Sequence, residues 1–494
     1  MSQLFSGQDI MNCNHSRDAQ WRQQLRDQIS AKERTAIPRA KMPELDPAYR
    51  ITCNEEVNQG LDASQAVTEA TRCLDCPDPQ CITGCPVGID IPGFIKNIQR
   101  GNFREAALVL KETSALPAVC GRVCPQERQC ESRCIYLKMK KPAVAIGYLE
   151  RFAADAMQHS GDDAIPACLP SNGMRVAVIG SGPAGLSFAG DMIKLGYDVT
   201  VYEALHQIGG VLKYGIPEFR LPNAVVDVEI NALEKMGVKF VKNCIVGKTL
   251  SYETLRQNGF DGIFIASGAG LPRFMGIPGE NLINILSSNE YLTRINLMGA
   301  GRPGWATPVP KGATVAIIGG GNTAMDSVRT AKRMGALRAI IVYRRSEEEM
   351  PARLEEIKHA KEEGVEFLTL HNPIEYIGDD KGHVRTMRLQ RMQLGEPDAS
   401  GRRSPVPVPG DIIDIDVDVV VVSVGVSPNP LIPDAFDGLD ITRRGTLVVD
   451  DTLLTTLPRT YAGGDIVRGG ATVILAMGDG RAAAKAMHTT LTKK

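Results

Sequence analysis

The sequence predicts an α/β fold in which two Rossmann-like nucleotide-binding domains follow a mainly helical, cysteine-rich domain. Two short apolar runs, at residues 175–179 and 314–318, each lead directly into a glycine-rich turn and a helix-like segment. Alternation of strands and helices is typical of parallel sheets. Ahead of these units, eight of the 12 cysteines lie between Cys73 and Cys134, and nothing in that block alternates like a long strand.

Length, charge and hydropathy exclude several classes of protein. The 494 residues suffice for about three domains. The 56 basic and 57 acidic residues nearly balance, which argues against a broad surface for nucleic acid or an anionic membrane. The most continuous apolar stretch, at residues 417–426, is about half of a membrane span. The N-terminus shows no secretory pattern, so we expect a cytoplasmic protein with no membrane and no nucleic-acid partner.

Changes in composition and in the hydropathy pattern divide the chain into five segments. The first is polar, is expected to be an extension or docking arm, and contains one possible helix at residues 16–29. The second carries the cysteines between short helices, for which two examples are residues 62–72 and 101–112. The remaining three form one nucleotide-binding domain interrupted by another. The expected boundaries are 1–45 for the extension, 46–170 for the helical domain, 171–300 and 426–494 for the first nucleotide-binding domain, and 301–425 for the second.

The cysteines have the spacing of iron–sulfur cluster ligands. The first run is Cys73-x2-Cys76-x4-Cys81-x3-Cys85-Pro86, which resembles the bacterial ferredoxin run with one wider gap. The second is Cys120-x3-Cys124-Pro125, followed by Cys130 and Cys134. A proline after a ligand stiffens the turn that presents the thiolate. Two four-iron clusters need eight ligands, and eight cysteines are present; two zinc sites are the alternative, and disulfides are disfavoured in a reducing cytoplasm.

The first glycine fingerprint indicates a flavin or nicotinamide dinucleotide site. It follows the strand at 175–179 and opens a helix, the arrangement that lets a pyrophosphate approach the backbone at a helix N-terminus. Glu203 ends the next strand, 18 residues beyond the last glycine, and an acid there accepts hydrogen bonds from a ribose. The residues of this fingerprint are Gly180, Ser181, Gly182, Pro183, Ala184 and Gly185.

The second fingerprint, with Gly319, Gly320, Gly321, Asn322, Thr323 and Ala324, differs at the end of its next strand. Arg344 and Arg345 stand there in place of an acid, and Arg353 lies just beyond. Because guanidinium groups pair with a 2′-phosphate, this difference predicts NADP(H) rather than NAD(H). The alternative is a solvated basic face balanced by nearby glutamates.

A terminal Gly463-Gly464-Asp465 follows the strand-like residues 460–462. An aspartate in this position can bond a ribityl hydroxyl. The helix that starts near Thr472 would direct its N-terminus at the flavin pyrimidine, where it favours the negative charge of a reduced flavin. The chain is therefore expected to be a flavoprotein with a nicotinamide site.

From about residue 40 onward, the sequence resembles the small (β) subunits of NADPH-dependent glutamate synthases. Similar modules occur in dihydropyrimidine dehydrogenase and in the large subunit of electron-bifurcating ferredoxin:NADP oxidoreductase. The segments that carry the resemblance are Met42-Pro-Glu-Leu-Asp-Pro47, Glu69-Ala-Thr-Arg-Cys-Leu-Asp-Cys76, Cys81-Ile-Thr-Gly-Cys-Pro86, Gly209-Gly-Val-Leu-Lys-Tyr-Gly-Ile-Pro217 and Arg344-Arg-Ser-Glu-Glu-Glu-Met-Pro351.

The resemblance implies two [4Fe-4S] clusters with a ligand set that differs from the cysteine count. One cluster falls on Cys73, Cys76, Cys81 and Cys134. The other falls on Cys85, Cys124, Cys130 and a non-cysteine ligand, which matches Glu150. Cys120 is then spare.

The resemblance also implies FAD and NADPH, and it assigns residues to each. Those expected around FAD, besides the first fingerprint, are Glu203, Gly210, Val211, Arg220, Val246, Gly464, Asp465 and Thr472. Those expected around NADPH, besides Gly319 to Thr323, are Arg344, Arg345, Arg353, Ser423 and Gly425.

The expected function is electron input: NADPH reduces FAD, the two clusters conduct single electrons, and an FMN-containing large subunit makes glutamate from glutamine and 2-oxoglutarate. No catalytic acid or base is assigned, because positioning and the cofactor dominate hydride transfer. The absence of cysteine beyond residue 244 argues against a thioredoxin-reductase-type disulfide relay. Glutamate formation itself is expected on the partner, because the chain begins Met-Ser and leaves no room for a further barrel of ~250 residues. The alternatives are a subunit of an electron-bifurcating ferredoxin:NADP oxidoreductase and a non-enzymatic zinc-bearing interaction protein.

Overall fold

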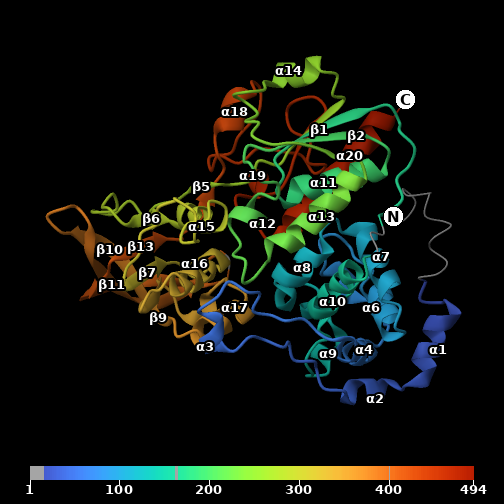
Figure 1. The fold of residues 1–494 in the computed structure, drawn as a ribbon, viewed down its shortest axis with the longest axis horizontal. Coiled ribbons are helices and arrows are strands. Elements are labelled where there is room, and N and C mark those ends of the chain that lie inside the picture. Colours follow the sequence, from blue (N-terminus) through green and yellow to red (C-terminus); the bar gives the residue numbers. More distant parts are fainter. Residues whose placement is uncertain (1–15, 162–164, 400, 494) are drawn as a thin grey trace.

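The computed structural model describes residues 16–161, 165–399 and 401–493, so residues 1–15 of the expected extension lie outside it. Figure 1 shows three parts: a helical domain coloured blue to cyan, a first Rossmann domain with the C-terminal helix α20, and a second Rossmann domain in yellow and orange. This arrangement confirms the expected fold class.

The helical domain is built from short capped helices. Asp62 caps α4 and forms a reciprocal capping box with Gln65, which fixes the start of that helix. The longest helix, α10, packs on α8 and α7 through a buried face that includes Leu149 and Phe152. No named strand occurs between residues 46 and 161, all of which the structure describes. The elements up to this point are α1 (Gln20–Gln28), α2 (Ala31–Ala36), α3 (Pro47–Arg50), α4 (Ala63–Arg72), α5 (Gln80–Thr83), α6 (Ile91–Gln99), α7 (Phe103–Thr113), α8 (Pro117–Val123), η2 (Gln126–Arg128), η3 (Glu131–Arg133), α9 (Ile135–Lys138) and α10 (Ile146–His159).

The first Rossmann domain has a five-stranded parallel sheet in the order β15-β4-β1-β2-β3. Its central strands are apolar and buried on both faces, as parallel strands between helices are. Helices α11 and α20 pack closely, since a Cβ added to Gly480 would lie 2.3 Å from the carbonyl oxygen of Ala184. The elements are β1 (Arg175–Ile179), α11 (Pro183–Lys194), β2 (Asp198–Tyr202), α12 (Val211–Tyr214), α13 (Asn223–Lys235), β3 (Lys239–Val241), α14 (Tyr252–Gln257), β4 (Gly262–Ile265), α18 (Leu431–Ala435), β15 (Thr460–Ala462), α19 (Asp465–Arg468) and α20 (Val473–Thr492).

The second Rossmann domain repeats this plan in the order β6-β13-β7-β8-β9. It begins earlier than the expected boundary at residue 301, because β6 pairs in parallel with β13. The chain passes between the two Rossmann domains twice, and the two connecting segments pair with each other as the antiparallel strands β5 and β14. The elements are β5 (Leu271–Pro272), β6 (Ile285–Ser287), α15 (Ser288–Asn296), β7 (Thr314–Ile318), α16 (Asn322–Arg333), β8 (Arg338–Tyr343), η4 (Glu347–Glu349), α17 (Leu354–Glu362), β9 (Glu366–Thr369), β13 (Val419–Val422) and β14 (Val426–Ser427).

A three-stranded antiparallel sheet extends from the second domain, where Figure 1 shows it at the far left. It consists of β10 (His371–Gly378), β11 (Val384–Pro397) and β12 (Arg403–Asp416). Among the described residues, no helix is both long and apolar enough to cross a membrane.

Candidate functional site

The first fingerprint forms the tight turn that its glycines predict. Gly180 has φ +102°, and a Cβ there would lie 2.4 Å from the carbonyl oxygen of Ala266. A Cβ on Gly182, the residue that precedes α11, would meet nothing within 4 Å. The space beside Gly182 at the N-terminus of a helix is what a pyrophosphate requires.

Glu203 is held by the fingerprint loop itself. One carboxylate oxygen accepts hydrogen bonds from the backbone N–H of Ser181, at 2.9 Å, and from its hydroxyl. The other accepts from the backbone of Leu205 at 2.9 Å. Because a carboxylate has about four acceptor positions, Glu203 keeps capacity for a ribose hydroxyl. Gly210 lies against the same loop, with its Cβ position 3.0 Å from the Cα of Gly182.

The terminal Gly-Asp motif lies beside the fingerprint. A Cβ on Gly464 would lie 2.9 Å from that of Ala184, and Thr472 caps α20 by accepting from the backbone of Leu475. Burial raises the pKa of Asp465 to about 6, against the hydrogen bond that the backbone of Ala471 donates. Tyr214, a residue that no sequence motif assigned to a site, lies near it: burial and then the charges of Asp465 and Glu203 raise the pKa of Tyr214 to about 12.

Three other residues expected around the flavin differ in their surroundings. Val246 is buried, and Val211 begins α12 directly after Gly210. Arg220 instead reaches the second Rossmann domain, where its Nη1 lies 2.8 Å from Oδ2 of Asp326. Its guanidinium therefore connects the two domains.

The second fingerprint has the same geometry as the first. Gly319 has φ +145°, with its Cβ position 2.3 Å from the carbonyl oxygen of Ser423, and Gly321 faces open space before α16. The side-chain oxygen of Asn322 accepts from the backbone of Arg353 at 2.8 Å. Gly320 and Gly425 lie in loops, Gly425 at φ +117°, and the exposed Thr323 lies in the first turn of α16.

The three arginines expected at a 2′-phosphate have different environments. Arg344 is exposed, and no hydrogen bond or ion pair is found for it among the described residues. Arg345 is nearly buried, with its Nη2 2.6 Å from Asp398 and its Nε donating to the carbonyl of Arg403 at 2.8 Å. Arg353 is also nearly buried and donates to the helical domain. Arg344 is therefore the one of the three that is available to an incoming phosphate.

The thiols expected to ligate the first cluster influence one another's pKa. Burial and the thiols of Cys73 and Cys134 raise the pKa of Cys76 to about 11, and the same influences together with Cys76 raise that of Cys81. These four thiols are half-buried.

The second group contains a carboxyl group with no hydrogen-bond partner on one oxygen. Burial raises the pKa of Cys85 to about 11, and Glu150 and Cys124 act in the same direction. The pKa of Cys130 is also raised, by burial and by a set of charges that includes Glu150, Cys124 and Cys85. Burial and then Glu229 raise the pKa of Glu150 itself to about 8, and its Oε1 has no hydrogen-bond partner. An unpaired buried carboxyl is costly, so these residues suit a cluster that Glu150 would ligate.

Cys120 is the cysteine that the resemblance leaves outside both ligand sets. It is fully buried, interacts with Cys124, and its Sγ is 3.4 Å from Sδ of Met477 on α20. Its thiol therefore faces the first Rossmann domain.

The described part of the N-terminal extension covers the first group. Asp75, between two of its cysteines, has φ +52° and a fully buried side chain. Arg22 and Arg26 of α1 pair with this carboxylate, the latter at 2.6 Å, and Arg17 donates to the Asp75 carbonyl at 2.9 Å. The described part of the extension therefore docks on the Cys73–Cys76 loop.

Two protein-family models match the chain, one over the helical domain and one over the Rossmann domains. The family model described as dihydropyrimidine dehydrogenase domain II, 4Fe-4S cluster, matches residues 50–162. The one described as pyridine nucleotide-disulphide oxidoreductase matches residues 174–480.

Similar whole chains are also known. The glutamate synthase [NADPH] small chain of Azospirillum brasilense is 38% identical, over 91% of this chain and 94% of that protein. The Escherichia coli small chain is 35% identical over 87% and 92%. Among solved structures, Mycobacterium tuberculosis FprA in complex with NADPH is 21% identical, with a TM-score of 0.54 over 65% of this chain and 85% of that one; this likeness concerns the fold alone.

The fold and these matches define an oxidoreductase in which a 4Fe-4S domain precedes a pyridine nucleotide-disulphide oxidoreductase domain. Within that class, the chain belongs to the family of the small chains of NADPH glutamate synthase.

Proposed function

We propose that this chain takes electrons from NADPH and passes them, through FAD and two [4Fe-4S] clusters, to an FMN-containing large subunit that makes glutamate from glutamine and 2-oxoglutarate. Membership of the small-chain family supports the pairing with a large subunit. We also propose a cytoplasmic location, where a reducing environment keeps cysteine ligands from forming disulfides.

Two contacts support the proposal: residues that adjoin the second cysteine group pack against α20, the helix whose N-terminus the flavin would face. Cys120 touches Met477, and a Cβ on the next residue, Gly478, would lie 3.1 Å from the carbonyl oxygen of Pro86. Pro86 follows Cys85, and Thr472 caps the same helix, α20. A cluster on the second group would thus be the first to receive electrons, and the half-buried first group would stand nearer to a partner.

FAD, when bound, supplies the conversion of two-electron hydride chemistry into single-electron transfer. The task of the chain is to hold the participants in place. The fingerprint turns at Gly182 and Gly321 would bind the two pyrophosphates, and the exposed Arg344 would distinguish NADPH from NADH. Seven cysteines and Glu150 would ligate the clusters, with Cys120 outside the set.

A reconstitution tests this function. Purified anaerobically and mixed with the glutamate synthase large subunit, the chain should support NADPH-dependent glutamate formation from glutamine and 2-oxoglutarate. NADPH oxidation that never yields glutamate with any such partner would contradict the proposal.

A second candidate is transfer of electrons to a different acceptor. A Geobacter sulfurreducens relative, 36% identical over 85% of this chain and 65% of that protein, is named NADPH-Fe(3+) oxidoreductase subunit beta. Copurification with a smaller flavin- and cluster-bearing subunit would favour a ferredoxin:NADP oxidoreductase. Colourless protein containing zinc would favour the non-enzymatic alternative instead.

A further inference from the structure

A loop from the helical side of the molecule reaches over the second Rossmann domain. It comprises residues 44–58 and carries α3, which Figure 1 shows beside α17. Its two ends are joined by an antiparallel bridge between Glu44 and Asn58 and by the hydrogen bond from Leu45 N–H to the Val57 carbonyl, at 2.9 Å. The N–H of Val57 also donates to the carbonyl of Phe219 in the first Rossmann domain at 2.9 Å. Through Val57 the 44–58 loop is therefore hydrogen-bonded to the first Rossmann domain, while its tip lies on the second.

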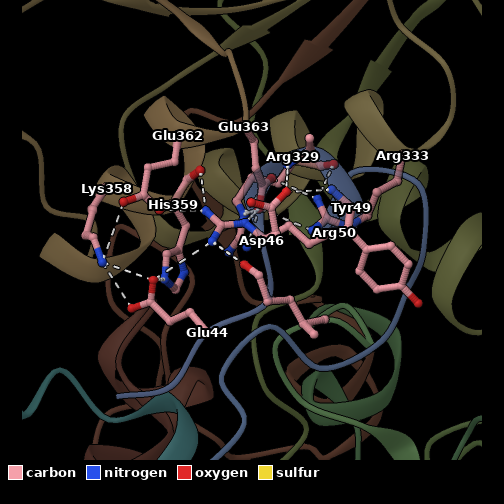
Figure 2. Close-up of polar contacts among 12 residues, drawn as sticks. Glu44, Asp46, Tyr49, Arg50, Arg329, Arg333, Lys358, His359, Glu362 and Glu363 are labelled. Carbon is pink, nitrogen blue, oxygen red and sulfur yellow. Dashed lines mark hydrogen bonds and ion pairs between the residues drawn. The ribbon is translucent and has the colours of Figure 1, made fainter. Parts of the chain in front are cut away.

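Arg50 makes the contact at the tip. Its side chain is 1% exposed, and Nε donates to Oε1 of Glu363 at 2.8 Å. Nη2 donates to Glu362 at 2.9 Å and to the carbonyl of His359 at 3.1 Å. Figure 2 shows this guanidinium between the carboxylates that end α17. A buried arginine with this many fixed acceptors holds two segments in one orientation.

The first Rossmann domain enters the same cluster through Phe219. The guanidinium carbons of Arg329 and Arg333, both on α16, lie 4.7 and 3.8 Å from the centre of its buried ring. Both arginines also pair with Glu363, each at 2.8 Å, and Arg333 donates to the carbonyl of Cys53 in the loop at 3.1 Å. Three separate parts of the chain thus meet around the Glu363 carboxylate.

The nearby trio Glu44, Glu355 and His359 has the residue types of a metal site but a different role. Lys358 donates to both oxygens of Glu44 at 3.0 Å, and Nη2 of Arg353 lies 3.1 Å from Oε2 of Glu355. Since both carboxylates already have a cation, a divalent ion would have to displace two ion pairs. The trio serves to hold the start of the loop on α17.

We propose that Arg50 is a positioning residue for hydride transfer: through the 44–58 loop it fixes the orientation of the second Rossmann domain against the first. The nicotinamide and the flavin are carried by different domains, and a displacement of about 1 Å between reacting groups can cost about 100-fold in rate. This inference rests on the NADPH-oxidising half of the proposed function. Arg50 itself touches neither nucleotide fingerprint.

The test compares R50A, R50K and the control R338A in the anaerobically purified, cofactor-loaded chain. We expect R50A to fold, because Glu363 retains its ion pairs with Arg329 and Arg333. Arg338 forms an exposed pair with Glu366 on the same domain, away from the loop. Stopped-flow reduction of the flavin by NADPH should slow by about 10- to 100-fold in R50A and by less in R50K, while the affinity for NADP⁺ changes by no more than about threefold.

A second measurement is independent of turnover. Hydrogen exchange should accelerate in the 44–58 loop and in α17 of R50A, and in neither segment of R338A. An unchanged hydride-transfer rate in R50A, or equal losses of rate and of NADP⁺ affinity, would overturn the inference. If R50A does not fold, R50K decides by the same criteria. Wild-type protein that NADPH cannot reduce would instead contradict the proposed function, and the exchange data would still report on the loop.

Discussion

The guanidinium of Arg353 donates to the side-chain oxygen of Gln126 at 2.6 Å and to the carbonyl of Arg122 at 2.7 Å, both in the helical domain. Its backbone N–H meanwhile donates to Asn322 in the second nucleotide fingerprint. Arg353 therefore joins the second fingerprint to the region of the second cysteine group, where it also lowers the pKa of Cys124 against the stronger opposing effects of Cys120 and burial. Because Arg345 is engaged by Asp398, the exposed Arg344 is the one of the three arginines that we propose for a 2′-phosphate.

Replacement of Arg344 by alanine should lower the preference for NADPH over NADH by roughly 10- to 100-fold, the equivalent of one lost charge-assisted hydrogen bond of about 1.5–3 kcal/mol. Arg345→Ala should lower the thermal midpoint and change the preference little, because its guanidinium is occupied within the protein. The measurement is kcat/KM for both nucleotides. An unchanged preference in Arg344→Ala would contradict the assignment.

The two cysteines that begin the second run should behave differently although they lie on consecutive turns. Cys124→Ala should lose one cluster, so that the iron content falls from about eight to about four per chain. Cys120→Ala should retain both clusters and the full iron content. Cys120 is directed at Met477 and serves as the matched control. Equal iron contents in the two variants would show that the division of ligands is wrong.

Glu150 supplies a separate test of the same cluster. Glu150→Ala should lose the iron of the second group, while Glu150→Gln should keep it with a changed reduction potential, because an amide oxygen replaces a carboxylate. The measurements are iron content and potentiometric titration. Full iron and an unaltered potential in Glu150→Ala would remove Glu150 from the ligand set.

The sequence predicted most elements that repeat a local pattern. The strands at 175–179 and 314–318 coincide with β1 and β7, because each is an apolar, β-branched run that ends at a glycine turn. The predicted start of the second Rossmann domain, at residue 301, was too late. Strand β6 has three residues, which are too few to indicate from the sequence which sheet they join.

The long-range ion pairs could not be predicted from the sequence, for a different reason. The arginines at positions 220, 345 and 353 have the residue type that nucleotide binding needs, yet their partners lie in other parts of the fold. Arg50 and Glu363 are separated by 313 residues. Only the tertiary structure reveals which of these arginines are held by distant partners and which face solvent.

Acid should weaken the contact between the 44–58 loop and the second Rossmann domain. Burial alone would raise the pKa of Glu363, but the charges and hydrogen bonds of Arg329 and Arg333 lower it to about 2 from a usual 4.5. A lowered carboxyl pKa gives stability that is complete above pH 4.5 and is lost as the pH falls toward 2, about 3 kcal/mol in all.

Glu363→Gln tests this directly, because it also leaves Arg50, Arg329 and Arg333 without their shared carboxylate. At pH 6 the variant should be less stable than wild type by about 3–5 kcal/mol, and the difference in thermal midpoint should narrow between pH 5 and pH 3. The exposed Glu366→Gln is the control, with an expected effect below about 1 kcal/mol. A difference that stays constant from pH 6 to pH 3 would mean that Glu363 is not held as a carboxylate by the three arginines.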